Sequence, residues 1–125
     1  MRVAIYTRKS VFSDKSDSVK NQARMCRDYI ELHFEGDHVY SIYEDEAYTG
    51  ANTARPALQN LIDDIKAGAL DFLIVYQLDR LSRNVRDFAN IYDILNANKV
   101  AFASVKESID TNTPIGETMM YMSVV

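Results

Sequence analysis

Short apolar runs alternate along this chain with stretches in which apolar residues recur every three or four positions. The runs cover residues 2–6, 38–43, 72–76 and 100–105, and they are rich in the β-branched and aromatic residues typical of strands. The periodic stretches predict amphipathic helices over residues 18–34, 56–67 and 85–96. Strands that alternate with helices indicate an α/β domain, with a mostly parallel sheet of four to five strands and helices on both of its faces.

The length and composition fit one domain that folds unaided. The chain has 125 residues, of which 47% are hydrophobic and 26% are charged, so a single core is expected and little disorder. The one cysteine, Cys26, excludes an internal disulfide and is expected in the core. The apolar run at the amino terminus is too short for a signal peptide or a membrane span, so we expect a cytoplasmic protein.

The net charge of the chain limits how it could bind nucleic acid. The charge is −4, from 18 acidic and 14 basic residues, which argues against a domain that holds nucleic acid by bulk electrostatic attraction. If the substrate is nucleic acid, this segment supplies the chemistry and another part supplies most of the affinity.

The main candidate for a functional site follows the apolar run at residues 72–76. Asp79, Arg80 and Arg83 come soon after this run, at the carboxyl end of the strand, where open α/β sheets bind their ligands. If the turn is helical, Arg80 and Arg83 lie on one face and present two guanidinium groups to one target, such as a phosphate. The alternative is that both arginines are solvated surface charges and that Asp79 caps a helix.

Other polar residues are expected at the same edge of the sheet. Arg8 and Ser10 follow the first strand, and Arg55 precedes Pro56 at the start of the second helix, whose dipole points to this edge. A serine hydroxyl surrounded by guanidinium groups fits attack on a phosphodiester, because that reaction needs charge stabilisation on the phosphoryl oxygens. We therefore expect phosphoryl chemistry that requires no cofactor.

Other serine and phosphate chemistries fit less well. His33 and His38 are not placed to act as a base for Ser10, and the sequence has neither a nucleophile elbow nor a nucleotide-phosphate loop. The acidic run at residues 44–46 could join Asp79 around a divalent cation. A loop is favoured instead, because no carboxylate follows the first strand.

Two alternatives from other functional classes remain open. A phospho-acceptor receiver domain has a similar size and topology, and Asp79 and Lys106 match its pattern, but residues 7–10 lack the acidic side chains that it needs. In such a domain Asp79 would take a phosphoryl group with Mg²⁺. The other alternative is a dimerisation module without chemistry, formed by the Met-rich segment at the end of the chain.

The last part of the chain differs from the rest. The sequence TNTPIGE at residues 111–117 is typical of a turn and a helix start, and residues 118–125 are largely apolar. We expect the first turns of a longer helix here. A partner subunit or the remainder of that helix would cover Met119, Met120 and Met122.

Five motifs follow one another along the chain: IYTRKS at residues 5–10, Gln22, ARPAL at residues 54–58, LDRLSR at residues 78–83 and DTNTPIGE at residues 110–117. In this order they resemble the catalytic domain of the serine recombinases, the resolvase and invertase family of site-specific DNA recombinases. The resemblance covers essentially the whole chain, and the ordered combination is more specific than any single motif.

The resemblance implies a mechanism and roles for individual residues. Ser10 would attack a DNA phosphate, giving a 5′-phosphoserine bond and a free 3′-hydroxyl, and strands would exchange by subunit rotation within a tetramer. No cofactor or metal is implied, and dimers and tetramers would form through the last helix. The family would place further side chains around the serine: Arg8, Arg55, Arg80 and Arg83 to hold the phosphate, Asp79 to orient an arginine or assist proton transfer, and Gln22 to support the site.

Two departures from the compact resolvases stand out. The loop between Ser10 and Gln22 is longer, and with Lys9 and the TNTP turn it resembles the large serine recombinases, which are phage integrases and mobile-element transposases. The last helix is truncated and the family's DNA-binding domains are absent, so residues 1–125 would be the catalytic domain alone. Such a domain should fold but bind DNA poorly.

Overall fold

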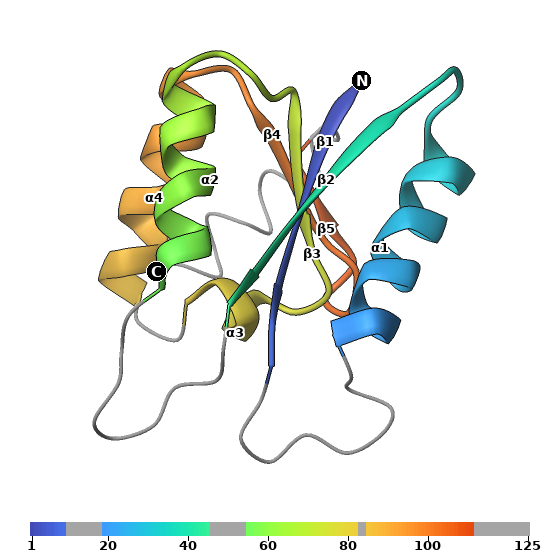
Figure 1. Cartoon of the computed structure of the whole chain (residues 1–125), viewed down its shortest axis with the longest axis horizontal. Coiled ribbons are helices and arrows are strands. Elements are labelled where there is room, and N and C mark those ends of the chain that lie inside the picture. The colour runs from blue at the N-terminus through green and yellow to red at the C-terminus, as the bar shows by residue number, and fades with distance from the viewer. Residues whose placement is uncertain (10–18, 46–54, 83–84, 112–125) are drawn as a thin grey trace.

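The computed structural model describes residues 1–9, 19–45, 55–82 and 85–111, and strands alternate with helices along them (Figure 1). The strands are β1 (Arg2–Arg8), β2 (Val39–Asp45), β3 (Phe72–Val75), β4 (Ala101–Ser104) and β5 (Ile109–Asp110). The helices are α1 (Val19–His33), α2 (Pro56–Lys66), α3 (Leu78–Leu81) and α4 (Val85–Ala97). Within these ranges, no helix is long and apolar enough to cross a lipid bilayer.

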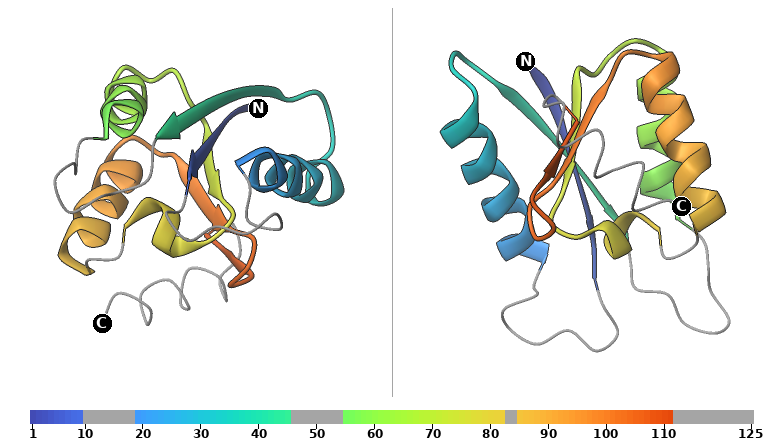
Figure 2. Two further views of the ribbon diagram at one scale, coloured as in Figure 1. Left: turned by 60° about the horizontal axis from the view of Figure 1, so that its bottom comes forward. Right: turned by 180° about the vertical axis from the view of Figure 1, so that it is seen from behind.

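The strands form one sheet in the order β2-β1-β3-β4-β5. The first four strands run parallel, and β5 pairs antiparallel with β4. Helix α1 covers one face of the sheet, while α2 and α4 lie side by side on the other (Figures 1 and 2). This is the mostly parallel α/β architecture, with helices on both faces, that the sequence predicts.

The side chains of β1 alternate between two hydrophobic cores, one on each face of the sheet. Val3 and Ile5 pack on the α1 side, together with the buried Cys26 that was expected in the core. Ala4 and Tyr6 pack on the side of α2 and α4. Because a fully buried aliphatic or aromatic side chain contributes about 1.5–3 kcal/mol, this double packing fixes β1 firmly in the middle of the fold.

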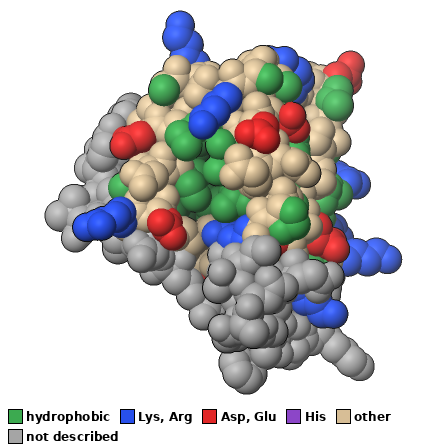
Figure 3. Space-filling model, turned by 60° about the vertical axis from the view of Figure 1, so that its left-hand side comes forward, with side chains coloured by type: hydrophobic (Ala, Val, Ile, Leu, Met, Phe, Trp, Pro, Cys, Tyr) green, Lys and Arg blue, Asp and Glu red, His purple; other side chains and the backbone are tan. Residues whose placement is uncertain are grey.

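Two helices share the second core, and their outer side is a mixed surface. Ile62 of α2 and Ile94 of α4 are partly buried against this core. Figure 3 shows this side of the molecule, where apolar side chains are grouped between charged ones. The polar face of each helix is thus turned to solvent, as its periodic sequence predicts.

The strand ends differ from the predicted ones. β1 does not stop at residue 6 but continues to Arg8, because it pairs with β2 as far as Arg8 opposite Asp45. β5 has two residues, too few to carry a periodic pattern. The predicted first residue of the first helix, at position 18, and the predicted helix at residues 118–125 lie outside the described residues.

Candidate active site

Three segments that are far apart in the sequence meet near the carboxyl end of β1. Arg8 is the last residue of β1, and Arg55 stands at the N-cap of α2. The one-turn helix α3 follows β3 and carries Asp79 and Arg80. The carboxyl edge of the sheet therefore gathers these residues, as the pattern of strand ends predicts.

Arg8 is buried, with 3% of its surface exposed, and it is held from two sides. Its Nη2 donates a hydrogen bond to the main-chain oxygen of Asp79 at 2.6 Å. The buried side chain of Gln22, in α1, donates from Nε2 to the main-chain oxygen of Arg8 at 3.3 Å. The end of β1 is thus fixed between α1 and α3. The predicted site residues Ser10 and Arg83 lie outside the described residues.

Arg55 lies against Tyr6 and reaches α3. Its Nε and Nη2 donate to the Tyr6 hydroxyl oxygen at 3.1 and 3.0 Å, and Nη2 also donates to the main-chain oxygen of Arg80 at 3.2 Å. The guanidinium carbon is 5.2 Å from the centre of the Tyr6 ring, which is within the range of a cation–π contact. These contacts direct Arg55 toward β1 and α3, the side expected from its place at the helix start.

Tyr6 in turn contacts Asp45 at the end of β2. The Tyr6 hydroxyl donates to Oδ2 of Asp45 at 2.7 Å, and the two carboxylate oxygens accept from the N–H groups of Ala57 and Leu58 at 2.8 and 3.0 Å. Asp45 therefore caps α2 from a different segment. Burial raises the pKa of Tyr6, the bond to Asp45 raises it further, and Arg55 opposes the shift. The phenol stays protonated and donates to the carboxylate.

Helix α3 is also capped from a distance. Glu107, which follows β4, accepts hydrogen bonds from the Leu78 N–H at 3.2 and 3.4 Å and from the Ser104 hydroxyl. The N-cap residues of α2 and α3 provide no side-chain cap of their own. The two helices that carry or follow site arginines, α2 and α3, are therefore both capped at their N-termini by a carboxylate from another part of the chain.

Arg80 is buried, with 3% of its surface exposed, and its Nη1 lies 3.7 Å from Oδ1 of Asp79. The interpretation of Arg80 as a solvated surface charge is therefore wrong, because the fold encloses its side chain. Asp79 does not cap the helix either, since α3 begins at Leu78 after the N-cap residue Gln77. Asp79 instead lies beside the guanidinium group that follows it.

The arrangement favours an anionic ligand. The described residues contain no group of three or more His, Cys, Asp or Glu side chains that could hold a metal ion, and Asp45 is engaged by Tyr6 and the start of α2. The ring nitrogens of His33 and His38 contact main-chain oxygens of their own segments. The site gathers guanidinium groups, which bind phosphate oxygens well.

The sequence indicates no role in this site for Tyr6 or Glu107, and it favours a loop for the acidic run at residues 44–46, whereas β2 continues to Asp45. Tyr6 was one of several apolar residues in a strand, although a buried phenol generally needs a hydrogen-bond partner. Asp45 is the last residue of β2, and Glu107 lies just beyond β4; the helices that they cap, α2 and α3, have no capping side chain at their own N-cap residues. That missing cap is the signal that could have identified both carboxylates.

Comparison with known proteins identifies the family. The family model described as "Resolvase, N terminal domain" matches residues 3–124. The DNA-invertase of Enterobacteria phage P7 is 36% identical over 81 residues, covering 65% of this chain and 42% of that protein. The Transposon Tn552 resolvase of Staphylococcus aureus is 27% identical over 106 residues, covering 80% of this chain and 53% of that protein.

Solved structures give the same result. The N-terminal catalytic domain of TP901-1 integrase superposes with a TM-score of 0.79 at 39% identity, covering 98% of this chain and 90% of that one. The C-terminal catalytic domain of ISC1926 TnpA, an IS607-like serine recombinase, has a TM-score of 0.68 at 26% identity, covering 84% of this chain and 70% of that one.

The chain therefore belongs to the serine recombinase family, as a resolvase N-terminal domain. The family assignment confirms the resemblance drawn from the ordered motifs, and it decides against the receiver domain. The chain spans about half, or less, of the length of the curated relatives named above. The activity of a whole protein of this kind is therefore a matter of proposal.

Proposed function

We propose that this chain is the catalytic domain of a longer site-specific DNA recombinase of the large serine type, with Ser10 as the nucleophile. The observation that supports this most directly is the attachment of Arg8 and Arg55 to the main chain of α3, which also carries the buried Arg80. The guanidinium groups of Arg8 and Arg55 thus lie against the helical turn that carries Arg80, and Arg8 is two residues before Ser10 in the sequence. Similarity to the TP901-1 integrase domain and the greater length of the curated relatives support the domain assignment.

The reaction is a phosphodiester transesterification. The Ser10 oxygen attacks the phosphorus of a DNA phosphodiester and loses its proton, the bond from phosphorus to the 3′ oxygen breaks, and that oxygen takes a proton. The products are a 5′-phosphoserine ester and a 3′-hydroxyl. Arg8, Arg80 and Arg83 stabilise the charge that develops on the phosphoryl oxygens, with a contribution from Arg55.

The remaining residues position these groups. Gln22 fixes the main chain at Arg8, and Asp79 orients the neighbouring Arg80 or assists proton transfer. The ester conserves the energy of the original phosphodiester, so reversal of the attack rejoins the strands without a nucleotide cofactor. The helix expected within residues 111–125 would join subunits into dimers and a tetramer, in a protein of the cytoplasm.

A search for covalent attachment tests the proposal. The full-length recombinase is incubated in EDTA with DNA that carries the end of its own element, denatured, and run on a gel that separates protein-linked DNA. We expect an adduct with the unaltered protein and with the control variant Ser41→Ala, which changes an exposed serine of β2. Ser10→Ala should give no adduct while still binding DNA.

Two outcomes would overturn the proposal. An adduct formed at the normal rate by Ser10→Ala would exclude this serine as the nucleophile. Cleavage that leaves no adduct and occurs only with Mg²⁺ would assign the chemistry to carboxylates, and the converging arginines would then serve another purpose.

A further inference from the structure

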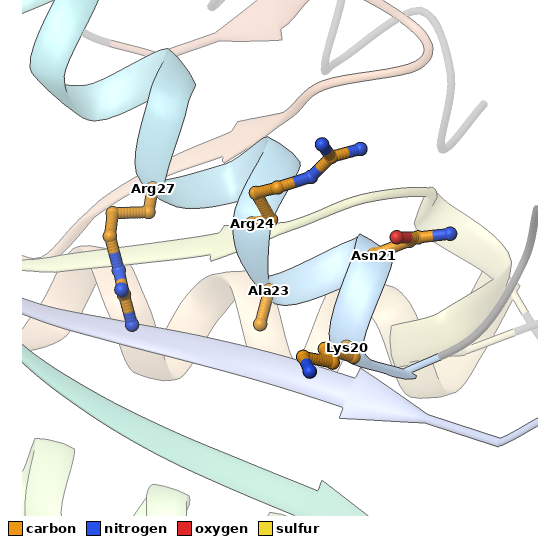
Figure 4. A pocket seen from close by; sticks show the side chains of 5 residues that line it. All are labelled: Lys20, Asn21, Ala23, Arg24 and Arg27. Carbon is orange, nitrogen blue, oxygen red and sulfur yellow. The ribbon is translucent and has the colours of Figure 1, made fainter.

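Helix α1 carries three cationic side chains on one side. Lys20, Arg24 and Arg27, named here the α1 basic stripe, are all exposed. With 3.6 residues per turn, they lie within about 60° of one another around the helix axis. In Figure 4, Lys20 and Arg27 extend toward the strands, whereas Arg24 extends away from them.

The stripe borders a hollow in the surface. Its volume is about 590 Å³, and the described residues that line it are the three stripe residues with Asn21 and Ala23 (Figure 4). Ala23 is small and almost buried, at 9% exposed, so the longer cationic side chains stand around it. A lining of three cations, an amide and one methyl group suits an anion far better than an apolar ligand.

In the part of the chain that the structure describes, none of the three stripe residues forms an ion pair. Arg27 lies over the ring of Tyr40, 5.3 Å from its centre, and the Tyr40 hydroxyl donates to Glu31. The acidic residues Asp28 and Glu31 follow the stripe along α1. Between Lys20 and Arg27 the helix therefore carries three positive charges and no negative one, in a chain whose net charge is −4.

The stripe begins beside the candidate active site. Gln22, in the same turn as Lys20, reaches the main-chain oxygen of Arg8 at 3.3 Å. From there the stripe extends to Arg27, a rise of about 10 Å along the helix. One strand of duplex DNA has a phosphate about every 3.4 Å along its axis, so the stripe matches roughly three successive phosphates.

We propose that the α1 basic stripe binds the phosphate backbone of DNA next to the phosphate that Ser10 attacks. The inference rests on the proposed function, since it assumes that DNA is the substrate. The exposed ammonium and guanidinium groups contact phosphates, so they position the DNA without reading its sequence. A protein that is negative overall thereby gains a local attraction for DNA at the edge where its chemistry takes place.

Charge reversal tests the stripe without any cleavage assay. Binding of this chain to a fluorescently labelled duplex of unrelated sequence is measured by anisotropy over a series of salt concentrations. Lys20→Glu with Arg24→Glu should weaken binding at low salt by at least about tenfold and should reduce the slope of log affinity against log salt by about two. The neutral pair Lys20→Gln with Arg24→Gln should show a smaller loss in the same direction.

The matched control has the same change in net charge on the opposite side of the molecule. Lys66→Glu with Lys99→Glu alters two exposed residues at the ends of α2 and α4, and it should weaken binding less than about threefold. If both double variants lose the same affinity for the duplex, the effect is one of net charge alone, and the proposal is overturned. It is also overturned if the unaltered chain shows no salt-dependent binding to the duplex. The covalent-adduct assay tests Ser10 independently of this binding assay, so the proposal for the stripe and the proposal for the nucleophile can each fail without the other.

Discussion

The Tyr6 hydroxyl donates a 2.7 Å hydrogen bond to the carboxylate of Asp45, and both residues are buried where β1 and β2 end. The same hydroxyl accepts from Arg55, and the same carboxylate accepts from the first N–H groups of α2. One continuous chain of hydrogen bonds therefore runs from the start of a helix, through two strands, to a guanidinium group of the candidate active site.

Removing the Tyr6 hydroxyl should interrupt this series of hydrogen bonds in the middle, between Arg55 and Asp45. In Tyr6→Phe, Arg55 loses the acceptor of two hydrogen bonds and the buried Asp45 loses a donor, so the free energy of unfolding should fall by about 1–3 kcal/mol. Formation of the covalent DNA adduct should slow by at least about tenfold, because Arg55 is less well oriented. Urea unfolding and the adduct assay measure the two effects.

Tyr43→Phe provides the control for this change. The Tyr43 hydroxyl donates to a carboxylate, that of Asp64, at 2.6 Å, and among the described residues it contacts no site arginine. Its loss should cost some stability and leave adduct formation at the normal rate. If both tyrosine variants slow the reaction equally, the effect of Tyr6 is one of stability and not of arginine orientation.

Glu107→Ala should loosen α3. The substitution removes the carboxylate that accepts from the Leu78 N–H and from the buried Ser104 hydroxyl, at a cost of about 0.5–2 kcal/mol. Hydrogen exchange at the Leu78 amide should become faster, and adduct formation should slow because Arg80 lies in this turn. The control Glu44→Ala removes an exposed carboxylate of β2 and should change neither. Unaltered exchange at Leu78 in Glu107→Ala would contradict the cap.

The free energy of unfolding should fall at acidic pH as the Asp71 carboxylate becomes protonated. Hydrogen bonds from the Arg2 side chain and main chain lower the pKa of Asp71 from 3.8 to about 2. The folded state favours the ionised form of the Asp71 carboxyl group. The contribution of this group to the free energy of unfolding is therefore complete above about pH 4 and is lost as the pH falls toward 2. The pair is substantially exposed, so less than about 1 kcal/mol is expected.

Urea unfolding between pH 2 and pH 5 tests this dependence. The difference in stability between the unaltered chain and Asp71→Asn should shrink steadily as the pH falls through this range. Arg2→Gln should produce a smaller change in the same direction, since it removes the guanidinium group but keeps the main-chain N–H that also donates to Asp71. A difference that stays constant with pH would mean that the pair does not couple folding to this carboxyl group.

The buried thiol should report on opening of the fold. Burial raises the pKa of Cys26 to about 12, so at pH 8 the group is a thiol with no exposed surface. A thiol reagent at pH 8 should react at least about a hundredfold more slowly with the folded chain than with the chain in urea. Rapid reaction of the folded chain would show that α1 separates readily from the sheet.

The sequence predicts the fold well because its signals are local and repeated. The burial of Phe72–Val75, for example, is encoded by the run of apolar residues itself. The ends of β1 and β2 could not be located in the same way. Whether Arg8 belongs to a strand depends on its pairing with Asp45, a residue more than thirty positions away whose partner no single stretch of sequence reveals.

The candidate site could be predicted in its residue types but not in its connections. The places of Arg8, Arg55 and Arg80 follow from the rule that strand ends gather at one edge. Arg8 and Arg55 each donate to a main-chain oxygen of α3, and because every residue has such an oxygen, no residue type in the sequence reveals these contacts. The carboxylates that cap α2 and α3 are likewise supplied across the sheet, so only the folded arrangement identifies them.

The hydrogen-bond acceptors of Arg8 and Arg55 in α3 affect how the site can bind an anionic ligand. Arg8 binds the main-chain oxygen of Asp79, and Arg55 binds that of Arg80. An amide oxygen carries a dipole but no net charge, so it fixes the direction of a guanidinium group without neutralising it. A carboxylate in that place would act as a resident counter-ion. Held in this way, the two side chains are aimed in advance by groups that bring no net charge of their own to the site.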